Sequence, residues 1–320
     1  MEQPILLSKN HPNYVELKRV IGTLLSFIDA DSVYVSSVDN GQQIRVLICL
    51  ILQKETTQKS EELYSITKGI FNSYPHFLYK IFDSERAAYS FRKGNLFFIR
   101  HCSINELVYK NSETSLVFNP TKDELDQLLQ KAKKRHIKER DEIHAVSRDL
   151  MMFIQNGNHV QVAYILHETI WELYYSASWF LTGTCISSKS INQQQSHISD
   201  YSYSLGTVFE KYDDEDAMLL QELDFACDAV CHNFNIAISK EIIPKITAKA
   251  ELLKEEVKGL FEENLRVCRE KFFISSDFER GVEEVKAVAI DEVKMRILKR
   301  VKDLQLECVN IIDEVFLGDG

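Results

Sequence analysis

Hydrophobic and polar residues follow two different periods along the chain, and the change of period divides it into two parts. In the first 118 residues, a helical pattern over 11–30 is followed by short runs of β-branched and aromatic residues. Asp39-Asn40-Gly41 is typical of a hairpin turn. The run after it is apolar nearly throughout, as in a strand buried on both faces. Besides a polar helix over 58–72, these patterns predict strands at 32–36, 43–52, 76–83, 95–100 and 106–110.

From residue 119 onward the pattern is helical. Pro120 and Thr121 mark a helix start, and Glu124 completes the spacing of a capping box. The pattern is interrupted at Asn156-Gly157-Asn158, at Gly183, in the polar and flexible segment 187–195, at Tyr212-Asp213-Asp214 and over 272–277. It therefore predicts helices over 121–155, 158–182, 195–211, 214–235, 239–275 and 277–316.

The fold class predicted from these patterns is α+β, in three parts. A small α/β domain occupies 1–118, an all-α bundle occupies 119–275, and a helical extension occupies 276–320. No run of about 18 uncharged apolar residues occurs, which predicts that no segment spans a membrane. The N-terminus has no basic start followed by an apolar stretch, so we expect no secretory signal. Seven scattered cysteines, an odd number, indicate reduced thiols and a cytoplasmic protein.

Charge is distributed unevenly between the two parts. Residues 1–120 carry 13 basic and 12 acidic side chains, whereas residues 121–320 carry 25 and 36. The acidic second part argues against broad, non-specific binding of nucleic acid there. A basic run on its first predicted helix either contacts phosphates or forms a solvated helix face; it contains Lys131, Lys133, Lys134, Arg135, Lys138 and Arg140.

One stretch of the helical part carries a recognisable motif. Residues 163–183 contain Leu166-His167 near their start, continue with a long apolar stretch, and end on Thr-Gly. This stretch resembles the second helix of HEPN domains, the nucleotide-binding helical domains of bacteria and higher eukaryotes. Glu168 stands where that family has Gln. Weaker matches follow in the family's order at Ser196-His197 and over 220–230.

The resemblance covers about 141–270. It implies a helical bundle that pairs as a homodimer and binds a nucleotide or an RNA. The order of a small α/β domain and then a HEPN domain also resembles bacterial proteins that fuse a minimal nucleotidyltransferase domain to a HEPN domain.

The catalytic signatures of both families are missing. Active transferases carry Gly-Ser after the first strand and two Asp, one residue apart, on the next strand to hold Mg²⁺. Here the first strand runs into Asp39, which we expect to be a turn residue, and the second strand offers Arg45 among apolar residues. The resemblance therefore implies a degenerate transferase-like domain that holds no metal or other cofactor.

HEPN ribonucleases carry an Arg and a His in the fourth helix with four to six residues between them. Here His232 has no Arg at that spacing, and only three residues separate Arg140 from His144. The absence of both catalytic pairs favours a protein that is not an enzyme.

The site predicted from the resemblance is a cleft between the second and fourth HEPN helices that contacts a base or a phosphate. The alternative is a core helix in which His167 is hydrogen-bonded inside the bundle. The predicted lining residues are His167, Glu168, Trp171, Asp228 and His232. Candidate phosphate contacts on the basic helix are Lys133, Lys134, Arg135 and Lys138.

A metal site is not predicted. Cys227 and Cys231 lie one helical turn apart with His232 beside them, but a zinc site usually draws four ligands from two ligand pairs. Because no second Cys or His pair is near in the sequence, free cysteines are the preferred interpretation.

The function predicted from the sequence is non-catalytic binding of a nucleotide, an RNA or a partner, with a regulatory role in a bacterial stress or defence system implied by the resemblance alone. Two alternatives stay open. One is an enzyme, either a divergent nucleotidyltransferase or a HEPN ribonuclease. The other is a structural protein that dimerises and holds no ligand.

Overall fold

The structure is a computed structural model that describes residues 5–278, apart from 55, 57, 113 and 149. All but the first three residues of the predicted extension over 276–320, and all but the first two of the predicted helix 277–316, lie outside the described residues. Residues Met1–Arg269 form one compact unit.

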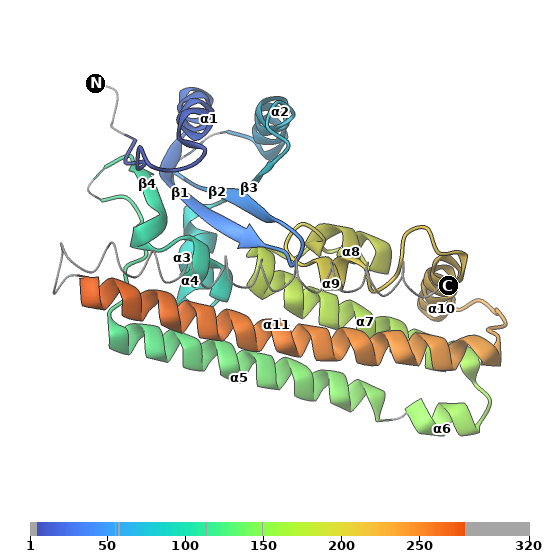
Figure 1. Ribbon diagram of the computed structural model, residues 1–320. Helices are drawn as coiled ribbons and strands as arrows, with labels where there is room; N and C mark the ends of the chain where they lie inside the picture. Colours follow the sequence, from blue (N-terminus) through green and yellow to red (C-terminus); the bar gives the residue numbers. More distant parts are fainter. Residues whose placement is uncertain (1–4, 55, 57, 113, 149, 279–320) are drawn as a thin grey trace, which may run out of the picture. The chain divides into compact units, whose positions relative to one another are not determined.

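The N-terminal part of this unit contains a four-stranded mixed sheet (Figure 1). Its strands are β1 (Ala30–Asp39), β2 (Ile44–Leu52), β3 (Phe77–Phe82) and β4 (Leu107–Lys110), in the order β3-β2-β1-β4. β1 pairs antiparallel with β2 and β4, and β2 pairs parallel with β3. The hairpin turn is confirmed, because the Asp39 carboxylate accepts a hydrogen bond from the Gly41 amide at 2.9 Å and Gly41 has a φ of 95°.

Helices cover both faces of the sheet. α1 (Tyr14–Phe27) and α2 (Ser60–Phe71) lie on one face, and α3 (Ser84–Arg92) and α4 (Leu96–His101) lie on the other (Figure 1). The predicted strand over 95–100 is wrong, because this segment forms α4. The Asn95 side chain accepts a hydrogen bond from the Phe97 amide at 2.9 Å and caps that helix.

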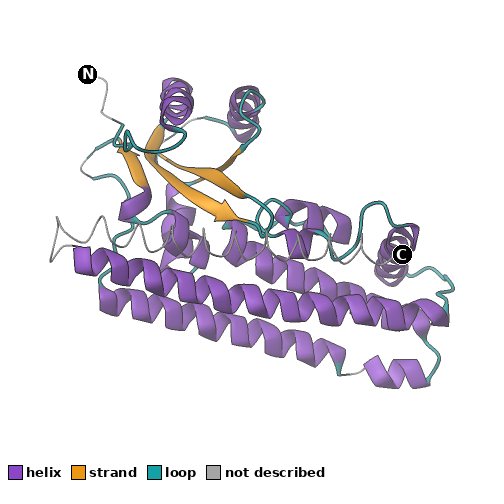
Figure 2. Cartoon of the chain, viewed as in Figure 1, coloured by secondary structure: helices purple, strands orange, loops and turns teal. Residues whose placement is uncertain are grey.

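The remainder of the described chain is helical (Figure 2). Its elements are α5 (Lys122–Ser147), α6 (Leu150–Gln155), α7 (His159–Thr182), α8 (Ile191–Ile198), α9 (Tyr203–Gly206), α10 (Asp214–His232) and α11 (Ile243–Phe278), with short 3₁₀ turns at Ile104–Glu106 and Lys240–Ile242. The capping box of Thr121 and Glu124 is confirmed at the start of α5. The mixed fold class, with a sheet in the N-terminal part and helices after it, is confirmed as well.

Three helix boundaries differ from the prediction. The helix predicted over 121–155 is divided into α5 and α6. The helix predicted over 195–211 is replaced by α8 and α9, and α8 begins inside the segment predicted to be a flexible break. The break predicted at 272–277 does not occur, because α11 continues to Phe278.

The central helix is α7, which contacts α4, α5, α6, α8 and α10. It ends at Gly183, whose φ of 72° lies in the left-handed region. A Cβ at this position would lie 2.6 Å from the ring of Phe97 on α4, so only glycine fits. No helix in the part of the chain that the structure describes is both long and apolar enough to cross a membrane.

Candidate functional site

The contact between α7 and α10 brings together four polar side chains, which we call the α7–α10 cluster: His167, Glu168, Asp224 and Cys227. His167 is only 1 % exposed. Its Nδ1 lies 3.4 Å from Glu168 Oε1, and its Nε2 lies 3.7 Å from Asp224 Oδ1. One ligand atom from each of His167, Glu168 and Cys227 lies within 4.8 Å of the others.

The groups of this cluster shift one another's pKa values. Burial lowers the pKa of His167, but the carboxylates of Asp224 and Glu168 outweigh it and leave that pKa raised. In return, His167 and then Lys189 lower the pKa of Glu168, against the effect of burial. Burial and then the neighbouring Cys231 raise the pKa of Cys227 to about 12. The cluster therefore favours positive charge, and it is poorly suited to an anion.

The predicted site residue Trp171 is joined to this cluster through Lys189. The Lys189 ammonium lies 2.8 Å from Glu168 Oε2 and 3.4 Å from the centroid of the Trp171 ring. The indole Nε1–H donates to the Ser188 carbonyl at 2.8 Å. One face of the indole is therefore already covered, and a base could stack there only if Lys189 moved.

The structure does not bring Asp228 and His232 to the same place. Both are exposed on α10, and the His232 Nδ1 lies 3.0 Å from the Asp228 carbonyl oxygen within their own helix. The positions of α10 that face His167 are Asp224 and Cys227 instead. The prediction thus places the α10 residues that face His167 about one helical turn too far along the chain.

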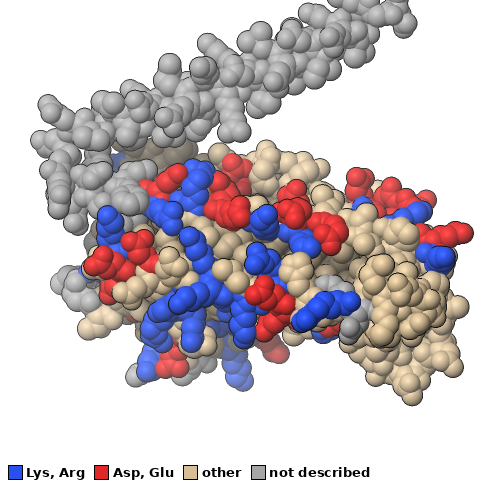
Figure 3. All heavy atoms as spheres, turned by 90° about the horizontal axis from the view of Figure 1, so that it is seen from below, with Lys and Arg blue, Asp and Glu red and all other residues tan. Residues whose placement is uncertain are grey.

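The basic run on α5 divides into engaged and exposed side chains. Arg135 Nε–H donates to Glu139 at 2.6 Å, and its guanidinium lies 4.2 Å from the centroid of the Trp179 ring. Lys138 lies 3.5 Å from Glu142. Lys134 is exposed and Lys133 half-buried. Figure 3 shows Lys and Arg side chains gathered on the face seen from below, where α5 and α11 lie, with acidic side chains among them.

A pocket of about 290 Å³ lies between α5, α7 and α11, and we call it the α5–α11 pocket. Basic side chains predominate in its lining, although Asp141 and Glu255 also contribute. Arg140 lies 3.6 Å from Asp141, and Lys258 lies 3.8 Å from Glu255, so neither of these cations is held by a short ion pair, whereas Lys254 lies 3.2 Å from Glu251. The lining residues used below are His136, Arg140, His144, Ser176, Lys254 and Lys258.

His136 lines this pocket and has one buried ring nitrogen without a partner in the described part of the chain. Its ring stacks on Phe261 with 3.9 Å between centroids. Its Nδ1 is buried and has no hydrogen-bond partner among the residues that the structure describes. Burial lowers the pKa of His136, so the ring is neutral at pH 7. A buried nitrogen without a partner costs free energy, which a bound ligand or water recovers.

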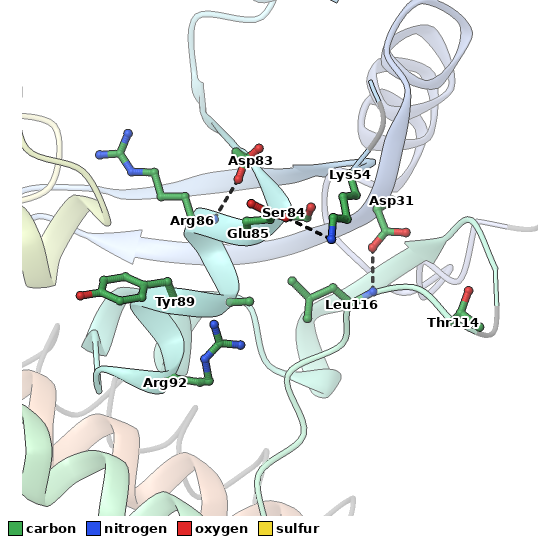
Figure 4. A pocket seen from close by; sticks show the side chains of 11 residues that line it. Asp31, Lys54, Asp83, Ser84, Glu85, Arg86, Tyr89, Arg92, Thr114 and Leu116 are labelled. Carbon is green, nitrogen blue, oxygen red and sulfur yellow. Dashed lines mark hydrogen bonds and ion pairs between the residues drawn. The ribbon is translucent and has the colours of Figure 1, made fainter. Parts of the chain in front are cut away.

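Two other hollows are less suited to a charged ligand. The groove beside α3 is larger, at about 950 Å³, but its three cations are matched by Asp31, Asp83 and Glu85. In Figure 4, Arg86 and Tyr89 project from one side of α3, whereas Lys54 lies on the other side and pairs with Glu85. These cations do not converge on one point.

The hollow between the sheet and α8 contains Lys80, whose ammonium donates to Thr184 Oγ1 at 3.2 Å and lies 5.3 Å from the centroid of the Tyr201 ring. Burial lowers the pKa of Lys80 to about 8. Arg45, on β2, is paired with Asp200 at 2.5 Å. Lys80 and Arg45 are thus already engaged within the protein, and the third cation of the lining, Lys68, lies 5.6 Å from the centroid of the Tyr64 ring.

Sequence reasoning missed Asp224 and the α11 lysines entirely. It named Arg140 as part of the basic run on α5, and His144 only as the partner of Arg140 in a pair with the wrong spacing. Their role depends on which helices become neighbours, which no local pattern reports. Comparisons of the chain with family models, with curated proteins and with solved structures found no match. The resemblance to HEPN and nucleotidyltransferase domains therefore stays a prediction from the sequence motifs.

Proposed function

We propose that this protein binds a phosphorylated ligand of nucleotide size, either a free nucleotide or one nucleotide of an RNA strand, in the α5–α11 pocket. The observation that carries the proposal is that Arg140, Lys254 and Lys258 line one pocket together with two imidazoles. Arginine and lysine are the side chains that proteins most often use to bind phosphate.

The size and polarity of the pocket agree with this ligand class. Its volume of about 290 Å³ is at the lower end of the range for small-molecule sites, enough for a mononucleotide but not for a large cofactor. Leu173, Val257 and Ile143 supply apolar surface for a base, and the cations supply charge for the phosphate. His136, whose pKa is lowered by burial, adds a neutral ring to the lining.

This proposal keeps the predicted function but moves its site. The predicted contacts His167 and Glu168 belong to the α7–α10 cluster, whose two carboxylates repel a phosphate, and Trp171 lies beside it. The exposed part of the basic run on α5, above all Lys134, lies on the same helix as the α5–α11 pocket. It would attract the rest of an RNA strand if the bound nucleotide belongs to one.

Isothermal titration calorimetry of the full chain with nucleoside monophosphates and with a short single-stranded RNA tests the proposal. We expect Arg140→Gln and Lys258→Gln each to weaken binding by about 10- to 100-fold, because a hydrogen bond to a charged group contributes roughly 1.5–3 kcal/mol. Binding should also weaken as salt increases. Binding of the RNA without any binding of the monophosphates would assign the site to RNA.

Two control variants make the same charge changes outside the pocket. Arg148→Gln follows the end of α5, and Lys245→Gln lies in the first turn of α11. Both should bind as the unmodified protein does. Equal losses in the controls and in the pocket variants would show that only overall charge matters, and unchanged affinity in the pocket variants would contradict the proposal.

A ribonuclease is the second candidate, and one observation favours it. Arg140 and His144 line the same pocket from one face of α5, so an Arg and a His meet there despite a spacing unlike that of HEPN ribonucleases. Incubation of an end-labelled RNA with the protein in the presence of a chelator tests this. Cleavage that disappears in His144→Ala and Arg140→Gln but persists in Arg148→Gln would establish it, and no cleavage leaves binding as the function.

The homodimer stays a prediction of the resemblance, and so does the role in a stress or defence system. The mass of the protein in solution, measured by light scattering, tests the dimer independently of any ligand.

A further inference from the structure

We propose that His167, Glu168, Cys227 and Cys231 bind one transition-metal ion, for which Zn²⁺ is the best fit, and that this ion links α7 to α10. The proposal does not depend on the phosphorylated ligand, because it concerns a different face of α7. It revises the preference for free cysteines, which rested on the lack of a second ligand pair near in the sequence. The structure supplies that pair from another helix.

The distances within the cluster match a tetrahedral site. Ligand atoms about 2.0–2.1 Å from a tetrahedral Zn²⁺ are about 3.3–3.4 Å apart. His167 Nδ1 and Glu168 Oε1 are 3.4 Å apart. Cys227 brings its sulfur within 4.8 Å of the ligand atoms of both residues, so a small side-chain adjustment completes three ligands.

Cys231 supplies the fourth ligand. It follows Cys227 by one helical turn, so both sulfurs lie on the same side of α10, and the Cys231 thiol is near enough to help raise the pKa of Cys227. Cys231 is exposed, whereas Cys227 is buried, so Cys231 closes the site from the solvent side. Four protein ligands make a structural site, and nitrogen, oxygen and sulfur are the donors that Zn²⁺ takes in proteins.

An unsatisfied buried atom points independently to a ligand here. His167 is 1 % exposed, and its Nδ1 has no hydrogen-bond partner within the described part of the chain. Glu168 Oε1 is near that nitrogen but does not form a hydrogen bond with it. A metal ion between these two atoms would satisfy both of them.

The surrounding residues are arranged as the outer partners of a metal site usually are. Metal-bound histidines commonly direct their other ring nitrogen toward a carboxylate, and the Nε2 of His167 faces Asp224 Oδ1 at 3.7 Å. Glu168 holds Lys189 with Oε2 at 2.8 Å, which leaves Oε1 for the ion. His167 and Glu168 are therefore each oriented by a second residue, Asp224 and Lys189 respectively.

Titration of the chelator-treated full chain with Co²⁺, followed by absorbance, tests the proposal because Co²⁺ replaces Zn²⁺ and has a spectroscopic signature. We expect one equivalent to bind, with a thiolate-to-cobalt charge-transfer band and the visible bands of tetrahedral cobalt, and Zn²⁺ to displace it. Cys227→Ser and His167→Gln should lose the charge-transfer band or weaken binding strongly. Asp224→Asn should weaken binding by about 10- to 100-fold, as is common for outer partners.

Matched controls separate this site from adventitious thiol binding. Cys185→Ser removes a partly buried cysteine that is not in the cluster, and Cys308→Ser removes one outside the described residues. Both should keep the spectrum. The proposal would be overturned if the unmodified protein showed no charge-transfer band. It would also be overturned if the band disappeared in Cys308→Ser but persisted in Cys227→Ser. Circular dichroism checks whether Cys227→Ser and His167→Gln fold. If either does not, the cobalt titration of Glu168→Gln and Asp224→Asn tests the site instead, because these side chains are partly exposed and their replacement should leave the fold intact.

Discussion

Replacing Gly94 tests how closely the turn between α3 and α4 packs against α5. Gly94 lies between α3 and α4 with a φ of 79°. A Cβ at this position would lie 2.3 Å from the Leu128 carbonyl oxygen and 2.9 Å from the Ala132 amide nitrogen, both in the backbone of α5. A helix backbone cannot move aside as a flexible side chain can, so Gly94→Ala must either displace α5 or distort the turn.

The cost has two parts of known size. A non-glycine residue in the left-handed region costs roughly 1–2 kcal/mol. Forcing a methyl group into a packed contact costs about 1–3 kcal/mol more. We therefore expect Gly94→Ala to lower the free energy of unfolding by about 2–5 kcal/mol, a large share of the roughly 5–15 kcal/mol that a domain possesses.

Gly157→Ala is the matched control, because Gly157 has a similar φ of 68° and nothing within 4 Å of the added Cβ. It carries the backbone strain without the steric overlap, and the effect of alanine on the unfolded chain is common to both variants. Urea unfolding followed by the fluorescence of the two tryptophans, Trp171 and Trp179, measures both. Equal destabilisation of the two variants would refute the close approach of Gly94 to α5.

Three further predictions concern the same compact unit. Thr121→Ala removes the capping box with Glu124 at the start of α5 and should cost about 1 kcal/mol in urea unfolding. Asn95→Ala removes the buried cap of α4 and should cost about 1–2 kcal/mol by the same measurement; no loss would argue against α4 as a capped helix. Burial lowers the pKa of Lys80 to about 8 from 10.5, so between these pH values the unfolded chain binds more protons and stability should rise with pH. Urea midpoints at pH 8 and pH 10 should show this rise, and Lys80→Met should reduce it.

Local chemistry decided which parts of the fold could be predicted. The hairpin after Asp39 and the start of α5 depend on side chains that bond within a few residues, and both were predicted correctly. The segment over 95–100 is a short apolar run, and such a run has no period that distinguishes a buried strand from a buried helix. Asn95 was the available signal for a helix start there, and its role as a cap was missed.

The segment 187–195, whose second half belongs to α8, was mistaken for a flexible break because its residues are polar. In the structure, Gln194 donates to the carbonyls of Ile186 and Ser188, and Gln195 donates to the Phe209 carbonyl at 2.7 Å. Buried amide groups are tolerated when they are hydrogen-bonded in this way. Polarity in a sequence indicates exposure only where tertiary hydrogen bonds do not intervene, and the sequence does not report those.

The central helix explains why the predicted binding residues and the favoured pocket differ. α7 faces α10 with His167 and Glu168, and it faces the α5–α11 pocket with Leu173 and Ser176. Ser176 follows His167 by nine residues, about 13 Å along a helix axis. The HEPN-like motif sits on the acidic side, which favours a cation, whereas the basic side chains that favour a phosphate come from the helices on either side of the pocket. At that separation, substitutions in the α7–α10 cluster and in the α5–α11 pocket should act independently. Loss of metal binding therefore tests only the cluster, and loss of the phosphorylated ligand tests only the pocket.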